Sequence, residues 1–255
     1  MTTQTSKTSQ PADEADTIKL SGMGYHFSAA GVSQLKADAY CLAVGAVDVS
    51  GSMDGEEQKL SDCFGHVLEA CDKAPNRDAI LFRLTQFNEQ VRELRGFVLP
   101  ANAPRVPFQT GGMTALGAAC VDAFKSVEAY AEHLLAQGDY QSNGIVFVLT
   151  DGEETVEDED HAITRVKAEI DRIRKSEKLN SLIAILVGFR PEPATEARQQ
   201  RFARETGMLY VKLADATPQR LAKFAKFVSQ STSSQSRQAG SKQAATITVP
   251  PDLSI

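Results

Sequence analysis

The sequence predicts an α/β fold: a Rossmann-like, doubly wound, mostly parallel six-stranded sheet with one antiparallel edge strand and helices on both faces. Strand-like and helix-like segments alternate from about residue 38 onward, which is typical of a parallel sheet covered on both sides. Two unbroken apolar runs, CLAVGAV at 41–47 and GIVFVLT at 144–150, have the composition of strands buried on both faces. Two further runs are joined too tightly for a parallel crossover, which makes one strand antiparallel.

That tight link lies between DAILFRLTQF at 78–87 and QVRELRGFVL at 90–99, which both read as strands. Only Asn88 and Glu89 separate them. Parallel strands need a long crossover, so the two runs are expected to form an antiparallel hairpin.

The remaining elements follow from the spacing of apolar residues. Residues 18–32 mix apolar residues with glycines, and whether they add an edge hairpin or lie over the sheet stays open. Two more strands are predicted over 181–187 and 208–213. Helices with one apolar stripe are predicted over 56–74, 114 to about 137, 161–177, 195–206 and 217–228.

Length and composition indicate one domain. The 255 residues, 42% of them hydrophobic, are enough to bury one sizeable core. Residues 1–17 have the low hydrophobicity of a disordered tail, and 229–255 are rich in Ser and Gln and read as a flexible tail. The expected domain therefore spans 18–228, with its core at 38–228.

Charge and targeting signals narrow the function. With 27 Lys and Arg against 33 Asp and Glu, the net charge of -6 argues against a nucleic-acid partner. The polar N-terminal stretch has no apolar core, and no segment approaches the roughly 18 consecutive apolar residues of a membrane-spanning helix. We expect a cytoplasmic protein with no membrane partner.

Cysteine and histidine usage gives no sign of redox or nucleophilic chemistry. Four cysteines without a CxxC pair are expected to be reduced core thiols: Cys41, Cys63, Cys71 and Cys120. The four histidines are scattered, without the spacing of a base beside a nucleophile, and are expected to be structural or solvated.

Oxygen-bearing side chains follow the two buried strands. Asp48, Ser50 and Ser52 come directly after the first run, and Asp151 after the second. Ligand sites of open α/β sheets lie at the carboxyl edge, where these ends would meet, and Thr114 follows a glycine-rich loop that could reach them. Five oxygen donors without nitrogen or sulfur suit a hard divalent cation. Because only two of them are charged, the ion would accept one more carboxylate, from another protein.

These motifs resemble the von Willebrand factor type A (vWA) domain with a metal-ion-dependent adhesion site (MIDAS). The pattern of that site is Asp-x-Ser-x-Ser, a distant Thr and a distant Asp. It matches DVSGSM at 48–53, GGMTALG at 111–117 and VLTDGE at 148–153, and the resemblance covers about 38–228. Compact intracellular bacterial members, of the tellurite-resistance and AAA+-associated type, look most similar.

The resemblance implies a role for each matching residue. Ser50 and Ser52 would bind the metal through their hydroxyls. Asp48 and Asp151 would hold it directly or through water. Thr114 would bind it when an external acid is bound. The family usually has Thr straight after the two glycines, whereas here Met113 intervenes. Thr110 is therefore a second candidate for the third-loop ligand.

The resulting interpretation is a non-enzymatic adaptor in an intracellular bacterial complex. Mg²⁺, with Mn²⁺ or Ca²⁺ as alternatives, would join it to an Asp or Glu of a partner protein, with an AAA+ ATPase, a kinase or a phosphatase as candidate partners. The acidic run at 153–160 is read as a solvated loop and helix start that could also select among acidic partners.

Two alternatives remain open. A Mg²⁺-dependent phosphohydrolase of the haloacid-dehalogenase kind also carries a nucleophilic Asp at a strand end. That family needs a second Asp two residues later, where this chain has Ser50. It also needs a Lys beyond its third motif, and none stands just upstream of Asp151. The other alternative is a scaffold that holds no metal, in which Asp48 and the two serines merely cap a helix.

Overall fold

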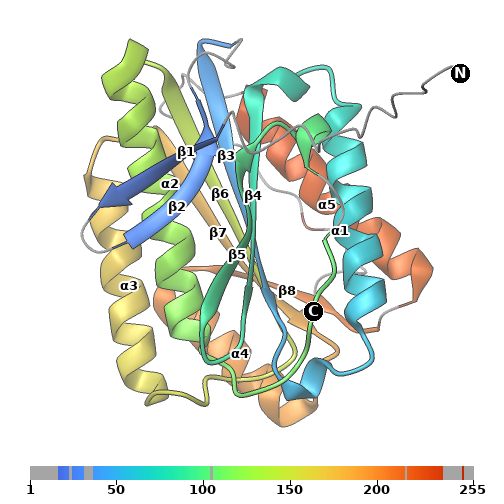
Figure 1. The fold of residues 1–255 in the computed structure, drawn as a ribbon. Helices are drawn as coiled ribbons and strands as arrows, with labels where there is room; N and C mark the ends of the chain where they lie inside the picture. The colour runs from blue at the N-terminus through green and yellow to red at the C-terminus, as the bar shows by residue number, and fades with distance from the viewer. Residues whose placement is uncertain are drawn as a thin grey trace, which may run out of the picture.

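A single mixed sheet forms the centre of the molecule (Figure 1). The computed structural model describes residues 17–22, 25–31, 37–103, 106–215, 217–237 and Val249. Its strands are β1 (Thr17–Gly22), β2 (Tyr25–Ala30), β3 (Ala39–Asp48), β4 (Ile80–Phe87), β5 (Val91–Val98), β6 (Gln141–Thr150), β7 (Ser181–Phe189) and β8 (Leu209–Leu213). They lie in the order β1-β2-β5-β4-β3-β6-β7-β8.

The predicted α/β class and mostly parallel sheet are confirmed. Strands β4, β3, β6, β7 and β8 are parallel neighbours, and β4 and β5 form the expected antiparallel hairpin. Strand β3 lies between β4 and β6, with Val47 opposite both Gln86 and Leu149. The strand ends that carry Asp48 and Asp151 are therefore side by side, as the sequence indicated.

The sheet has two strands beyond the six predicted ones, both from the segment that the sequence left open. β1 and β2 pair as an antiparallel hairpin, and β2 joins β5 at Ala29 and Phe97. β5 is antiparallel as predicted, but β2 covers its outer side, so it does not lie at the edge. Aromatic packing explains the addition: Phe27 of β2 meets Phe97 edge to face at 6.0 Å, and Phe97 stacks on Tyr130 at 5.0 Å.

Helices cover both faces of the sheet (Figure 1). They are α1 (Glu57–Asp72), α2 (Leu116–Gly138), α3 (Glu159–Lys175), α4 (Pro193–Thr206) and α5 (Pro218–Arg237). Helices α2, α3 and α4 bury apolar side chains in one core cluster, and α1 and α5 in the other. Because the helices that follow β3 and β6 cover opposite faces, these neighbours form a topological switch point, where open α/β sheets place their ligands.

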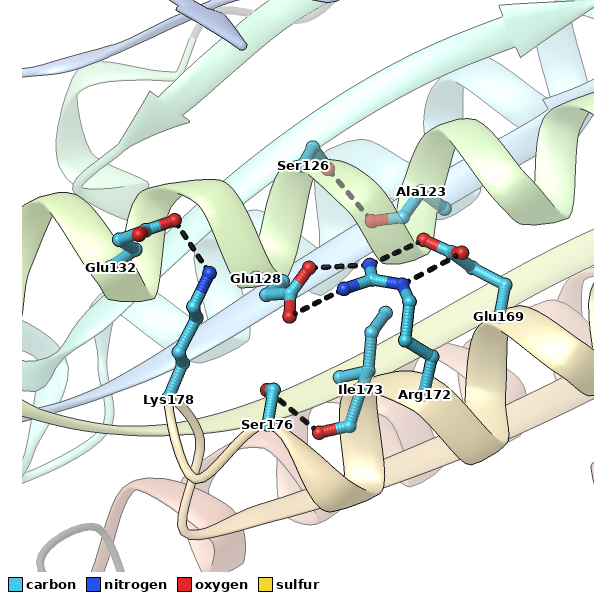
Figure 2. Close-up of polar contacts among 9 residues, drawn as sticks. All are labelled: Ala123, Ser126, Glu128, Glu132, Glu169, Arg172, Ile173, Ser176 and Lys178. Carbon is cyan, nitrogen blue, oxygen red and sulfur yellow. Dashed lines mark hydrogen bonds and ion pairs between the residues drawn. The ribbon is translucent and has the colours of Figure 1, made fainter. Parts of the chain in front are cut away.

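An ion pair joins α2 to α3 (Figure 2). The buried carboxylate of Glu128 accepts two hydrogen bonds from the Arg172 guanidinium, which also binds Glu169. Burial raises the pKa of Glu128, but the bonds from Arg172 outweigh it and hold that pKa below its ordinary value. The pair fixes the position of α2, the helix that follows the loop containing Thr114.

The closing helix runs further than the sequence suggested. Residues 229–237 were expected in a flexible tail, yet α5 continues to Arg237. Its polar end is held by hydrogen bonds to the amino ends of the strands: Asn143 Nδ2 donates to the Gln235 carbonyl at 3.1 Å, and Gln235 Nε2 to the Gly144 carbonyl at 3.2 Å. The Ser- and Gln-rich composition of these residues is also typical of flexible tails, so it did not predict that they dock on the sheet. The expected N-terminal tail, apart from Thr17, and most of the remaining C-terminal tail lie outside the described residues.

The structure also bears on the cysteines and on membrane-spanning helices. All four cysteines are free and buried, as predicted. None of the helices in the described ranges combines the length and apolar character needed to cross a bilayer.

Candidate metal site

Strand β3 delivers Asp48 to the carboxyl edge of the sheet, where its side chain is fully buried. The Ser50 amide donates to Asp48 Oδ1 at 2.8 Å, and the Thr150 hydroxyl donates to Oδ2 at 2.5 Å. Burial raises the pKa of Asp48 to about 6, and the bonds from Thr150 and Ser50 act against that rise. Both oxygens are thus held in place, one by a donor from the loop after β3 and one by a donor from the end of β6.

A chain of polar contacts runs from Ser50 to Asp151. The hydroxyl oxygens of Ser50 and Ser52 lie 3.2 Å apart, and Ser52 Oγ donates to Asp151 Oδ1 at 2.7 Å. Partial burial raises the pKa of Asp151, while the Ser52 hydrogen bond and the nearby charge of Arg190 lower it. The structure therefore brings three of the sequence-predicted residues into direct contact, with Asp48 bonded to the first of them.

Glycines let a third loop approach these residues. The Gly111 amide donates to the Val49 carbonyl at 2.7 Å, and the Gly51 amide donates to the Gly112 carbonyl at 3.0 Å. Gly112 has φ +85°, and a Cβ there would lie 2.7 Å from a carboxylate oxygen of Glu89. Only glycine fits such a position without strain. The two loops are therefore paired through their backbones beside the strand end.

Thr114 is buried at the end of this third loop. The Thr155 amide donates to its carbonyl at 2.9 Å, and its own amide donates to Thr155 Oγ1 at 2.8 Å. A Cβ on Gly152 would lie 3.3 Å from Thr114 Oγ1 and 3.9 Å from Ser52 Oγ. The two hydroxyls thus border one small space, which stays open because residue 152 has no side chain.

Thr110, the other candidate in this loop, is turned toward α1. Its hydroxyl donates to Glu57 Oε1 at 2.5 Å and to Asp54 Oδ1 at 3.3 Å. The bond from Thr110 is the main cause that lowers the pKa of Glu57. The geometry therefore favours Thr114 over Thr110 as a neighbour of Ser52.

Several residues that support the site were not singled out in the sequence. Asn88 Nδ2 donates to the Gly111 carbonyl at 2.9 Å, and Glu89 Oε1 accepts from the Met113 amide at 3.2 Å. From the sequence, Asn88 and Glu89 were expected only to link the two strands of the hairpin. Their side-chain role depends on the β4–β5 turn lying against the third loop, which no local pattern reveals.

Gln199 of α4 is a second missed support. Its buried side chain donates through Nε2 to the Gly152 carbonyl at 2.8 Å and accepts from the Tyr210 hydroxyl at 3.1 Å. A glutamine in an amphipathic helix gives no sequence signal of this kind. It fixes the loop that begins at Asp151.

The acidic run at 153–160 mostly organises loop backbone and helix starts. Glu154 is buried, and its carboxylate accepts from the amides of Gly117 at 2.7 Å and Val156 at 2.9 Å. Asp158 caps α3 by accepting from the His161 amide at 3.0 Å. The expectation of a solvated run is therefore wrong for Glu154, because the amino end of α2 needs an acceptor there.

An open hollow of about 350 Å³ adjoins the site. The turn that begins at Arg190 forms one wall. Arg190 has φ +47° and pairs with Glu56, which also pairs with Lys59 at 2.9 Å. The lining residues are Ser52, Glu56, Asp151, Gly152, Phe189, Arg190, Glu192 and Thr195.

The residues at this edge fit a hard divalent cation. The five side chains supply hydroxyl and carboxylate oxygens, which are the ligand types that Mg²⁺ and Ca²⁺ take. The space beside Gly152 is bordered by two of those hydroxyls. Among the described residues, groups of three or more His, Cys, Asp or Glu suited to a metal do not occur, so this candidate depends on its serines and threonine.

The sequence matches no protein-family model and no curated protein. The fold is similar to that of a D319A mutant of the PilB minor pilin from Streptococcus sanguinis, with a TM-score of 0.59, 13% identity and coverage of 80% of this chain and 63% of the other. It is also similar to the pilus adhesin SpaC from Lactobacillus rhamnosus GG, with a TM-score of 0.56, 10% identity, and coverage of 86% and 33%.

A third similar structure is the ArnB paralog VWA2 from Sulfolobus acidocaldarius, with a TM-score of 0.49, 15% identity, and coverage of 76% of this chain and 45% of the other. The chain thus spans less than two thirds of each of these three proteins. At such low identity, the similarity to the minor pilin and the adhesin shows a shared fold, and the function must be argued from the site.

Proposed function

We propose that this chain is a vWA domain that binds an Asp or Glu side chain of a partner protein through a divalent cation, Mg²⁺ with Mn²⁺ or Ca²⁺ as alternatives. The observation that carries the proposal is the contact chain from Ser50 through Ser52 to Asp151, which joins two distant segments by side-chain oxygens. The fold and the sequence motifs point the same way.

Each residue has a distinct task in this proposal. Ser50, Ser52 and Thr114 offer neutral hydroxyls, and Asp151 adds a partly exposed carboxylate. Asp48 already accepts from the Ser50 amide and the Thr150 hydroxyl, so it orients the loop and adds charge. When bound, the cation supplies a Lewis-acidic position that the protein neutralises with only two carboxylates, which leaves it attractive to an external acid.

The same residues argue against hydrolysis as the function. A phosphohydrolase of the haloacid-dehalogenase kind needs a second acid two residues after its nucleophile, as a proton donor and acceptor. Here Ser50 occupies that position and contacts Ser52. In addition, both Asp48 oxygens accept hydrogen bonds within the protein. Binding without turnover therefore explains the arrangement better.

The sequence resemblance supports a more specific role. In its size and in the LTDGE segment at 149–153, the chain resembles compact intracellular bacterial vWA proteins of the tellurite-resistance and AAA+-associated type. We propose an adaptor role in a complex with an AAA+ ATPase, a kinase or a phosphatase as partner.

Metal titration and partner capture test the proposal together. Calorimetric titration with MgCl₂ should give one binding event in the wild type and none in a Ser50→Ala/Ser52→Ala variant. Ser176→Ala is the matched control, because Ser176 caps the far end of α3 and donates to the Ile173 carbonyl. Partner capture should be abolished by EDTA and by the double variant. Capture that survives EDTA, together with no heat on adding Mg²⁺, would favour the metal-free scaffold.

A further inference from the structure

Two exposed apolar side chains stand on the loops of the candidate site. In the described part of the chain, the large hydrophobic residues that are strongly exposed are Met113 at 50%, Val156 at 45% and Leu209 at 46%. Met113 directly precedes Thr114, and Val156 lies on the loop that follows Asp151. Leu209 begins the outer strand β8, two strands beyond β6.

The backbone brings Met113 and Val156 close to one another. Their neighbours Thr114 and Thr155 are joined by two hydrogen bonds: the Thr155 amide donates to the Thr114 carbonyl at 2.9 Å, and the Thr114 amide donates to the Thr155 hydroxyl at 2.8 Å. The amides of Met113 and Val156 are also held, by Glu89 at 3.2 Å and by Glu154 at 2.9 Å. Both side chains therefore project from fixed backbone, and no large rearrangement is needed to present them. We call Met113 and Val156 the apolar pair.

A single exposed apolar residue is common on protein surfaces and needs no explanation. The apolar pair differs because its members follow and precede two residues that are bonded to each other, Thr155 and Thr114, and Thr114 borders the proposed metal space, whereas Leu209 stands alone. Met113 is also the residue that separates the two glycines from Thr114, where the vWA pattern usually has none. A flexible thioether suits a surface that must adapt to a partner side chain.

We infer that the apolar pair is a specificity surface, which selects partners in which the metal-binding Asp or Glu is flanked by a large apolar residue. This inference rests on the proposed function, because the partner carboxylate fixes the position of its neighbours. The proposed cation provides the complementary charge for the acid, and the apolar pair covers the side chain beside it. A partner with only charged residues around its acid would leave both apolar side chains in water.

Capped tripeptides provide a direct test with the intact chain. Leu-Asp-Leu, Gly-Asp-Gly and Leu-Asn-Leu are titrated in the presence of Mg²⁺, and binding is followed by the amide NMR signals of Ser52 and Gly152. Covering part of two apolar side chains should make Leu-Asp-Leu bind about three to ten times more tightly than Gly-Asp-Gly. Leu-Asn-Leu should not bind, because it lacks the carboxylate.

Variants then locate the gain in affinity. A Met113→Gln/Val156→Thr double variant should bind both Asp peptides equally, at the wild-type affinity for Gly-Asp-Gly. Leu209→Thr, at a similarly exposed residue, should keep the full preference. Since all three positions are exposed, these variants should fold normally, which the amide spectra will show.

The outcomes separate this inference from the proposed function. If Gly-Asp-Gly binds only with Mg²⁺ but Leu-Asp-Leu binds no better, or if the preference survives in the double variant, the specificity surface is wrong and the metal site stands. If neither Asp peptide binds in Mg²⁺, the proposed function fails and the inference fails with it. If Leu-Asn-Leu binds as tightly as Leu-Asp-Leu, binding does not depend on the carboxylate, which also overturns the inference.

Discussion

Ser52 Oγ lies 2.7 Å from Asp151 Oδ1, although 99 positions separate the two residues in the chain. This contact exists because β3 and β6 are parallel neighbours whose loops leave the same edge of the sheet. If the small space beside this contact holds a cation, changes to the residues around it should alter Mg²⁺ binding in distinct ways.

Gly152→Ala should weaken Mg²⁺ binding with little effect on stability. The added Cβ would lie 3.3 Å from Thr114 Oγ1 and 3.9 Å from Ser52 Oγ, so it fills the space that the two hydroxyls border. We expect affinity to fall by about tenfold or more, as for other changes beside metal ligands. Calorimetry gives the affinity, and thermal unfolding of the metal-free protein serves as the control. An unchanged Mg²⁺ affinity would place the cation elsewhere.

Thr114→Ala and Thr110→Ala should behave differently. Thr114 shares the space beside Gly152, whereas Thr110 donates to Glu57 and Asp54. Loss of the Thr114 hydroxyl should therefore reduce Mg²⁺-dependent binding of Gly-Asp-Gly by about tenfold or more. Thr110→Ala should leave it unchanged. The reverse result would make Thr110 the third-loop ligand.

Gly112→Ala and Gly55→Ala form a matched pair that tests the third loop. Both residues have left-handed φ, +85° and +82°, but a Cβ on Gly112 meets Glu89 while a Cβ on Gly55 meets nothing within 4 Å. Both variants should lose about 1 kcal/mol of unfolding free energy from the backbone alone. Only Gly112→Ala should also lose Mg²⁺ affinity, because it displaces the loop before Thr114. Chemical denaturation and calorimetry measure the two effects, and equal Mg²⁺ affinities in the two variants would argue against loop positioning by Gly112.

Glu128→Gln tests the ion pair that positions α2. Because the folded-state pKa of Glu128 is depressed, the charged carboxylate adds stability above the pKa of the unfolded chain. That contribution is lost as the pH falls through the folded-state pKa. Arg172 is 41% exposed, which limits the expected loss at neutral pH to about 1 kcal/mol. The difference between wild type and variant should shrink as acid is added, and a constant difference down to pH values below the folded-state pKa would contradict the ionic origin.

The sequence was sufficient to predict the central sheet, and that Asp48, Ser50, Ser52 and Asp151 meet at one of its edges, because both depend on local patterns. Unbroken apolar runs mark the buried strands β3 and β6, and the polar residues after them mark the edge where their loops meet. The glycine-rich stretch before Thr114 was expected to be a loop that could reach these strand ends, and its Gly111 and Gly112 are hydrogen-bonded there to Val49 and Gly51.

What could not be predicted depends on contacts between distant segments. The β1–β2 hairpin forms because Phe27 packs on Phe97 and Tyr130, which no local spacing foretells. The last part of α5 is Ser- and Gln-rich like a disordered tail, and only its hydrogen bonds to Asn143 and Gly144 reveal it as a docked helix. Gln199 likewise gains its role solely from the loop against which α4 packs.

The central claim is that Ser50, Ser52 and Asp151 lie around one divalent cation. The most direct measurement is anomalous diffraction from crystals soaked in MnCl₂, collected near the manganese absorption edge. The account predicts a single strong peak within coordination distance of the Ser50 and Ser52 hydroxyls, which disappears in the Ser50→Ala/Ser52→Ala variant. A soaked wild-type crystal with no peak beside these serines would contradict it.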